Sequence, residues 1–166
     1  MFTTLSDREI VMTRVVDAPR RLGSALVVLA LAALAACGGS PATGALRIET
    51  ADGPVELAVE IVDSPGERSR GLQGRESLPE RSGMLFLYDE DTRGGFWMKD
   101  TRVPLSIAFL DAGGLILAIL DMEPCRADPC PVYEPGVAYR SALEVNRGAL
   151  AHLGVAVGDV ASLPSG

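Results

Sequence analysis

The chain has 166 residues, of which 15 are basic and 22 acidic, so its formal net charge is −7 at neutral pH. This balance excludes a general nucleic-acid-binding protein, which needs a basic surface to neutralise phosphates. The length suffices for one domain with a hydrophobic core, even after removal of a targeting segment.

The N-terminus has the features of an export signal. Arg14, Arg20 and Arg21 form a basic region, and the apolar run LGSALVVLALAALAA follows at residues 22–36. This run is shorter than the roughly 20 residues that cross a bilayer as a helix, and it suits the apolar centre of a signal peptide. We therefore expect residues 1–36 to be a signal peptide and the protein to be exported.

Cys37 follows the apolar run in the sequence Leu34-Ala35-Ala36-Cys37, which resembles a bacterial lipobox. In that motif the cysteine carries lipid and becomes the mature N-terminus. The alternative is an ordinary signal peptide and a chance cysteine, but the small residues before Cys37 favour lipidation. Because no Asp follows, we expect the outer membrane, facing the periplasm. Residues 37–44 then predict a flexible tether, and residues 45–166 a single domain.

The domain begins with a predicted strand at Val55–Val62, where apolar and acidic residues alternate. A helix start follows: Ser64 as N-cap, Pro65 in the first turn and Glu67 as its capping-box partner. Gly71 and Gly74 should end this helix within about two turns.

Further short strands and a second helix follow along the chain. Asp111–Gly114 is a predicted hairpin turn, and Leu115–Leu120 is apolar on both faces, so we expect it to be covered on both sides. Asn146 is the predicted cap of a helix that ends near His152. The pattern predicts an α+β fold with a mostly antiparallel, strongly bent or barrel-like sheet and two short helices. The strands are expected at Met84–Tyr88, Gly95–Lys99, Leu105–Leu110, Leu115–Leu120, Tyr139–Val145 and Asp159–Leu163.

Cys125 and Cys130 are the two cysteines of the expected domain. An exported protein meets an oxidising compartment, so an even pair predicts a disulfide bond. Half a zinc site is the weaker alternative, because no second cysteine pair exists and His152 is the only histidine.

Lys99 is the only lysine and stands two residues after the only tryptophan, Trp97; every other basic residue is arginine. In a strand these two side chains share one face, and Phe96 and Met98 share the other. Lys99 then either extends to water along a core strand or lines a groove beside Trp97. An aromatic surface beside an ammonium suits a sugar or a small anion.

Several segments between about Leu46 and Val160 form a recognisable pattern: RGLQGRESLP, GMLFLY, FWMKDTRVPLSIAFLD, MEPC and ALEVNRG. On these segments the sequence resembles the family named domain of unknown function 192. Gln73, Asp100 and Ser106 depart from the usual Met, Asn and Asp of the family pattern. The resemblance implies a compact, mostly β domain that is often exported, and it implies no established reaction.

The match to the family's RGL--R pattern draws attention to Arg70 and Arg75, which could bind a carboxylate or phosphate or pair with an internal acid. The residues predicted to bind a ligand are Arg70, Arg75, Trp97, Lys99, Asp100 and Glu144. We expect Lys99 to be partly buried beside Trp97, in a pocket shared with Arg70 or Arg75, and to pair with Asp100, Asp111 or Glu144.

The favoured function is a lipid-anchored envelope module that binds a small anionic or saccharide ligand, without a cofactor, a metal or a nucleic-acid partner. One alternative is an enzyme that uses Lys99 with an acidic partner. A second is copper handling through Met84, Met98 and Met122, and a third is a protein-contacting envelope factor.

Overall fold

The computed structural model describes residues 41–162. The expected signal peptide and Cys37 lie outside this range. Within it, no helix is long and apolar enough to cross a membrane. The elements are β1 (Ala42–Thr50), β2 (Gly53–Val62), α1 (Pro65–Arg70), β3 (Ser82–Thr92), β4 (Phe96–Trp97), β5 (Leu105–Leu110), β6 (Ile116–Met122), β7 (Val132–Tyr133), β8 (Tyr139–Asn146), α2 (Ala149–His152) and β9 (Val160–Ser162).

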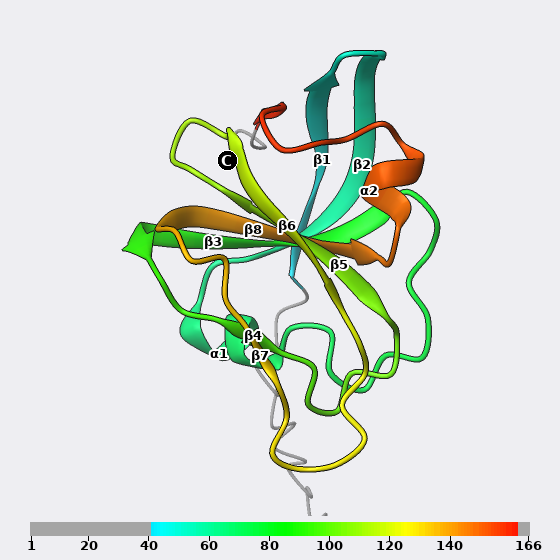
Figure 1. Cartoon of the computed structure of the whole chain (residues 1–166), viewed down its shortest axis with the longest axis vertical. Helices are drawn as coiled ribbons and strands as arrows, with labels where there is room; N and C mark the ends of the chain where they lie inside the picture. The colour runs from blue at the N-terminus through cyan, green and yellow to red at the C-terminus, as the bar shows by residue number, and fades with distance from the viewer. Residues whose placement is uncertain (1–40, 163–166) are drawn as a thin grey trace, which may run out of the picture. The chain divides into compact units, whose positions relative to one another are not determined.

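Seven strands form one curled sheet in the order β6-β5-β8-β3-β2-β1-β9, and β4 pairs with β7 in a small second sheet. All neighbouring strands are antiparallel except β2 and β3, which are parallel. Figure 1 shows β1 and β2 extending together at one end, and α1 with β4 and β7 gathered at the other. The predicted α+β class with a strongly bent, mostly antiparallel sheet and two short helices is confirmed.

β9 is one edge of the curled sheet and also contacts the opposite edge, at the start of β6. β9 pairs with β1, and it also reaches the start of β6, where Leu115 and Val160 form a bridge. The amide of Ile116 donates to the carbonyl of Asp159 at 2.9 Å, and the amide of Ala161 donates to the carbonyl of Gly114 at 2.8 Å. These bonds join the two edges at one end of the half-barrel.

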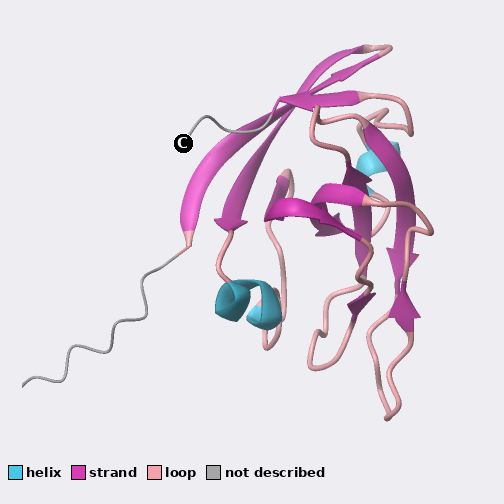
Figure 2. Ribbon diagram, turned by 90° about the vertical axis from the view of Figure 1, so that its left-hand side faces the viewer, coloured by secondary structure: helices cyan, strands magenta, loops and turns pink. Residues whose placement is uncertain are grey.

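The two faces of the curled sheet support two hydrophobic clusters. One face of the curled sheet, whose ribbon Figure 2 shows, carries an inner cluster together with residues from β9 and α2. The other face carries an outer cluster, against which Phe96 of β4 and Tyr133 of β7 pack. From Ala142 to Val145 the side chains of β8 alternate between the two clusters, as strand geometry requires, whereas Tyr139, beyond a register shift against β3, also joins the outer cluster. The inner cluster includes Leu46, Ile48, Leu57, Leu85, Leu110, Leu143, Val145 and Leu150, and the outer cluster Leu72, Met84, Phe86, Met98, Ile107, Phe109, Met122 and Tyr139.

The capping box of α1 is present as predicted. The Ser64 hydroxyl accepts a hydrogen bond from the Glu67 amide at 3.3 Å, and the Glu67 carboxylate accepts one from the Ser64 amide at 3.2 Å. The helix ends at Gly71, whose φ of 46° would be unfavourable for other residues. The chain therefore turns sharply and lays residues 71–75 over the outer face of the sheet.

β1 was not predicted as a strand, although it pairs along its full length with β2. Since β1 begins at Ala42, the last three residues of the expected tether belong to the sheet. The predicted strand Gly95–Lys99 is reduced to Phe96–Trp97, because β7 offers only two residues as partners and the chain turns at Asp100, where φ is 56°.

Two further expectations are wrong in detail. Asn146 does not cap α2: it ends β8, and its side-chain amide donates to the carbonyls of Leu78 and Pro79 at 2.8 and 3.3 Å. The predicted strand Leu115–Leu120 is covered on both faces only in part. β6 is an edge strand, and its residues from Leu117 to Leu120 are partly exposed.

Closure of the half-barrel predicts that Gly114 is required for stability. Its φ is 84°, and an added Cβ would collide with the carbonyl of Ala161 in β9. We expect Gly114→Ala to lower the free energy of unfolding by about 1–3 kcal/mol from backbone strain, and further by displacing β9. Urea unfolding measures this loss.

Gly113→Ala is the matched control, because the nearest atom to its Cβ would be a carboxylate oxygen of Asp111 at 3.3 Å and its φ is not in the left-handed region. Equal stability of the two variants would contradict a role of Gly114 in closure.

Candidate functional site

A small pocket opens on the outer face of the sheet, between α1 and β4. Its volume is about 40 Å³, and it is lined by residues 68–73, Phe86, Phe96, Trp97, Thr101 and Glu144. We call it the Glu144 pocket. A single water molecule needs about 10–15 Å³ of such space, so the pocket holds one small chemical group and not a whole ligand.

Glu144 is the buried acid of this pocket. It lies in the central strand β8, opposite Met84 of β3 and Ile107 of β5, and only 4% of it is exposed. Strand alternation places it on the outer face, between inward-facing Leu143 and Val145. Within residues 41–162 its carboxyl group has no ion-pair partner within 4.0 Å. Burial raises its pKa from 4.5 to about 8, so the group is protonated at neutral pH and can donate a hydrogen bond.

Trp97 lies at the edge of the Glu144 pocket and is 52% exposed. Its neighbour Phe96 points the other way and packs edge-on against Phe86, with ring centroids 5.0 Å apart. The predicted alternation is therefore present, with Phe96 and Met98 in the outer cluster and Trp97 towards solvent. An exposed indole beside a polar hollow is a surface on which a sugar ring can stack.

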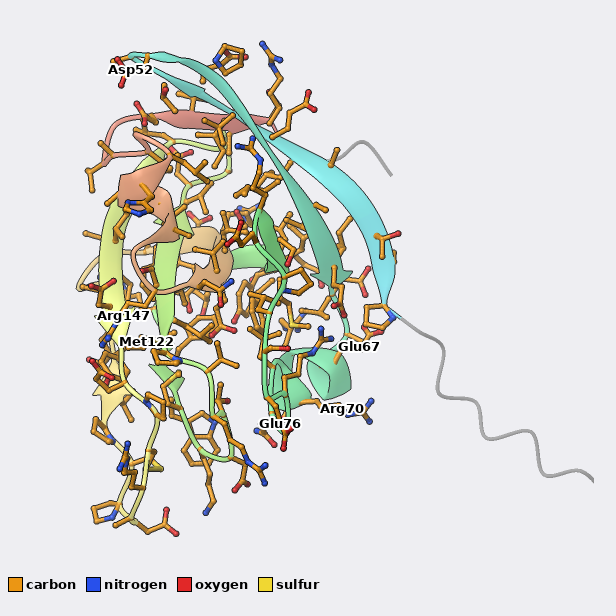
Figure 3. The ribbon with its side chains drawn as sticks, turned by 90° about the vertical axis from the view of Figure 1, so that its right-hand side faces the viewer. Asp52, Glu67, Arg70, Glu76, Met122 and Arg147 are labelled. Carbon is orange, nitrogen blue, oxygen red and sulfur yellow. A yellow bond between two sulfur atoms is a disulfide. The ribbon has the colours of Figure 1, made fainter. Side chains whose placement is uncertain are left out.

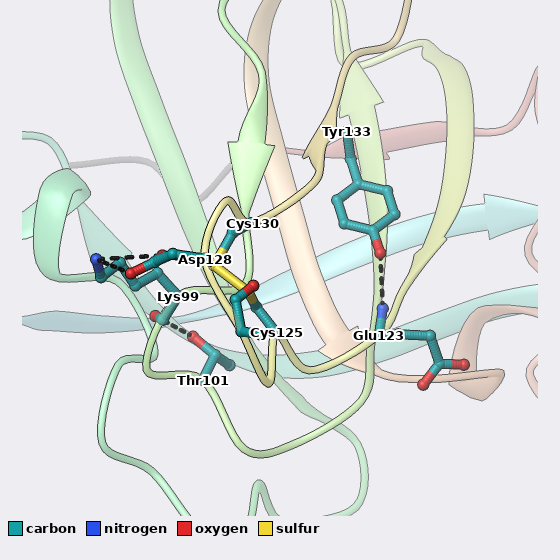
Figure 4. The surroundings of a disulfide bond; sticks show 8 residues. Lys99, Thr101, Glu123, Cys125, Asp128, Cys130 and Tyr133 are labelled. Atoms are coloured by element: carbon teal, nitrogen blue, oxygen red, sulfur yellow. Dashed lines mark hydrogen bonds and ion pairs between the residues drawn. A yellow bond between two sulfur atoms is a disulfide. The ribbon is translucent and has the colours of Figure 1, made fainter.

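Lys99 lies beside Trp97 but does not line the Glu144 pocket. Its ammonium is 5.8 Å from the centroid of the Trp97 ring and 3.3 Å from a carboxylate oxygen of Asp128 (Figure 4). The predicted partners Asp100, Asp111 and Glu144 are thus wrong. Asp128 lies far along the chain, so strand alternation around Lys99 could not reveal it.

The disulfide bond between Cys125 and Cys130 is present in the structure. It closes the loop that carries Asp128, as Figure 4 shows. The amide of Cys125 donates to the carbonyl of Met98 at 3.4 Å, which attaches this loop to the segment that follows β4. The disulfide loop therefore holds Asp128 where it meets Lys99.

Arg75 has a structural partner. Both terminal nitrogens of its guanidinium contact the carboxylate of Glu60 in β2 at 2.5 Å, and this bond raises the pKa of Arg75. Arg75 therefore fastens the turn after α1 to the sheet. Asp100 is exposed in the turn after Lys99, and its carbonyl accepts a bond from Gly74.

Arg70 and Arg68 line the Glu144 pocket from the last turn of α1. Arg70 is exposed and has no ion pair among the residues that the structure describes; Figure 3 shows it on the outside of the helix. Arg68 donates to the carbonyls of Asp63 and Leu87, and its guanidinium lies 4.8 Å from the centroid of the Tyr88 ring.

The sequence analysis did not single out Arg68 or Thr101. Thr101 follows Asp100 in the FWMKDTRVPL segment, and Arg68 lies two residues before Arg70. Both are therefore close in sequence to predicted ligand-binding residues. Of the six predicted ligand-binding residues, the pocket brings together Arg70, Trp97 and Glu144.

The three methionines proposed as copper ligands, Met84, Met98 and Met122, are buried in the outer cluster with aromatic and aliphatic side chains. Between residues 41 and 162 no group of three or more His, Cys, Asp or Glu side chains could hold a metal ion. The thioethers here fill the core.

A larger cavity of about 510 Å³ lies beside α2. Three of its polar side chains are engaged within the protein: the amide of Asn146 bonds to Leu78 and Pro79, Arg147 pairs with Glu123, and Arg81 donates to the carbonyl of Glu56. Glu80 and His152 also line this cavity. The Glu144 pocket is therefore the stronger candidate site, because its buried acid faces the opening without an ion-pair partner.

The fold is similar to those of two solved bacterial proteins. A protein from Sinorhizobium meliloti 1021, described as a "putative transcription regulator", is 31% identical; the match covers 75% of this chain and 95% of that one, with a TM-score of 0.68. A protein of unknown function from Novosphingobium aromaticivorans DSM 12444 is 24% identical over 76% of this chain and 94% of that one, also with a TM-score of 0.68, and this likeness shows the fold alone. No curated protein matches the chain.

The family model of domain of unknown function 192, described as "Uncharacterized ACR", matches residues 47–163. This range runs from β1 to just beyond β9 and includes every residue of the Glu144 pocket. The resemblance seen in the sequence is confirmed, and the chain belongs to the domain of unknown function 192 family.

Proposed function

We propose that the protein is a lipid-anchored module of the cell envelope that binds a small saccharide at the Glu144 pocket. Anchoring is inferred from the signal-like N-terminus and the lipobox-like sequence at Cys37. Saccharide binding is inferred from the geometry of the pocket and its edge. Family membership adds no reaction and no ligand.

The observation that carries this proposal is a buried carboxyl group without an ion-pair partner at the opening of a polar hollow. Burying an ionisable group without a partner destabilises a folded protein. A valine or methionine at position 144 would fit the outer face of β8 at lower cost. Glu144 is therefore better explained by a contact with a ligand than by packing.

Two observations favour a saccharide over a free inorganic anion. Arg75 and Lys99, two of the predicted anion-binding residues, are engaged by Glu60 and Asp128. The exposed ring of Trp97 offers a flat apolar surface of the kind on which sugar rings stack. The pocket then receives one substituent of the ring, while the ring itself lies outside on Trp97.

No comparable observation supports the alternatives. The ammonium of Lys99 contacts Asp128, and not Asp100 or Glu144 as an acid–base pair would require. A role in transcription regulation, as in the description of the Sinorhizobium protein, is not favoured. Acidic residues outnumber basic ones in this chain, whereas binding to DNA needs a basic surface.

The first test of saccharide binding uses Trp97 as the reporter, because it is the only tryptophan of the chain. We expect sugars from a panel of neutral and acidic monosaccharides to change its fluorescence and to raise the melting temperature. For Trp97→Ala we expect that at least a tenfold higher sugar concentration is needed for the same rise in melting temperature. Val157→Ala, which also removes an exposed apolar side chain, is the control and should bind normally. A panel without any response would refute the proposal.

The second test measures the stability cost of Glu144. The folded protein keeps this proton up to about pH 8, whereas the unfolded chain releases it near 4.5. The folded state thus binds more protons in this range, so stability falls as the pH rises from 4.5 to 8. Relative to Glu144→Gln, the wild type should lose up to about 1.4 kcal/mol of unfolding free energy per pH unit.

Urea unfolding at several pH values gives this difference, and Glu90→Gln, a change at an exposed glutamate, should follow the wild type. Parallel pH profiles of the wild type and Glu144→Gln would show that Glu144 is not a buried, unpaired acid.

The third test concerns the anchor. We expect mass spectrometry of the mature protein to find an N-terminal Cys37 with a diacylglyceryl group and an amide-linked acyl chain, enough lipid for stable membrane association. Cys37→Ser should abolish the modification. Processing at another residue, or an unmodified Cys37, would contradict lipid anchoring.

A further inference from the structure

We propose that the saccharide is an acidic one, whose carboxylate enters the Glu144 pocket, accepts a hydrogen bond from the carboxyl group of Glu144 and is compensated by Arg68 and Arg70. This inference rests on the proposed function and names the class of ligand for the same site. It follows from the charges that line the pocket, from the state of its acid and from its size.

The side chains around the pocket carry an excess of positive charge. Arg68 and Arg70 both line it, and neither has an acidic partner within ion-pair distance among residues 41–162. Arg68 is held in place by the carbonyl of Leu87 at 2.9 Å and by the ring of Tyr88. Glu67 in the same helix interacts electrostatically with Arg70 and offsets part of its charge. In a protein with a net charge of −7, two arginines without an ion-pair partner around one small hollow favour an anionic group.

The only acid of the pocket does not cancel these charges at neutral pH. Burial raises the pKa of Glu144 to about 8, so the group is neutral and acts as a donor. The titratable groups around it are Arg68 and Arg70 of α1 and Tyr88 of β3, and burial raises the pKa of Tyr88 as well. The segment from Trp97 to Thr101 also carries Lys99 and Asp100, but neither of these residues lines the pocket. A neutral carboxyl group in a pocket that Arg68 and Arg70 line is suited to donate a hydrogen bond to a carboxylate.

The size of the pocket limits the group that enters it. About 40 Å³ holds a flat carboxylate but leaves the sugar ring outside, against the exposed face of Trp97. A uronic acid presents a carboxylate directly on its ring and so meets both conditions. Glucose has the same ring with a hydroxymethyl group in place of the carboxylate and is the matched probe.

The experiment titrates the mature protein with glucuronate and with glucose and follows the fluorescence of Trp97. At pH 7 we expect glucuronate to bind at least tenfold more tightly than glucose. Above pH 8 its affinity for the wild type should fall about tenfold per pH unit, because only protonated Glu144 donates and its fraction falls by that factor. In Glu144→Gln the side-chain amide donates the hydrogen bond and does not titrate. We therefore expect this variant to bind glucuronate more weakly than the wild type, with an affinity that does not change between pH 7 and 9.5.

Calorimetry of the wild type at pH 8.5, in two buffers of different ionisation enthalpy, gives an independent measurement. Glucuronate binding should take up a proton, because it selects the protonated form of Glu144. Equal affinity for glucose and glucuronate, binding without proton uptake, or the same loss above pH 8 in Glu144→Gln would each overturn the acidic-saccharide inference and leave saccharide binding standing. If neither sugar binds, the acidic-saccharide inference is wrong, and the proposed function is wrong as well if the whole monosaccharide panel gives no response.

Discussion

The parallel pairing of β2 with β3 is the constraint on which the site depends. Two parallel neighbours cannot be joined by a tight turn, so the chain must cross one face of the sheet between them. Here the crossover contains α1 and the turn that follows it, and the pair of Arg75 with Glu60 fastens that turn to β2. The crossover thereby covers the outer face of β8, so that Glu144 of this strand lines a pocket beneath it.

Much of the fold could be predicted from local patterns. The capping box at Ser64 was recognised because its bonds are made within four residues, and most strands were recognised by their apolar runs. β1 was missed because only Leu46 and Ile48 mark its buried face, while its stability as a strand comes from β2 across the turn at Asp52-Gly53. That Asp-Gly pair is a common hairpin signal, and it was the available clue.

The site was less predictable, since its contacts join distant parts of the chain. The opposite orientations of Trp97 and Phe96 followed from strand alternation, but the partner of Lys99 did not, because the loop that carries Asp128 is placed by a disulfide bond and by tertiary contacts. Glu144 was marked as a possible ion-pair partner. Its lack of such a partner becomes visible only when the side chains of α1, β3 and β5 are in place around it.

The register of β1 has a consequence for how an anchored protein would meet its ligand. Ala42 pairs with Ile61 at the end of β2, just before α1, so the first residue of the sheet lies at the end of the domain that carries the Glu144 pocket. Five peptide units from Cys37 to Ala42 span at most about 18 Å. The lipid that we propose on Cys37 would therefore hold the pocket within a short distance of the bilayer surface. Such a protein would sample sugars attached to the membrane or to the adjacent wall far more often than sugars diffusing freely.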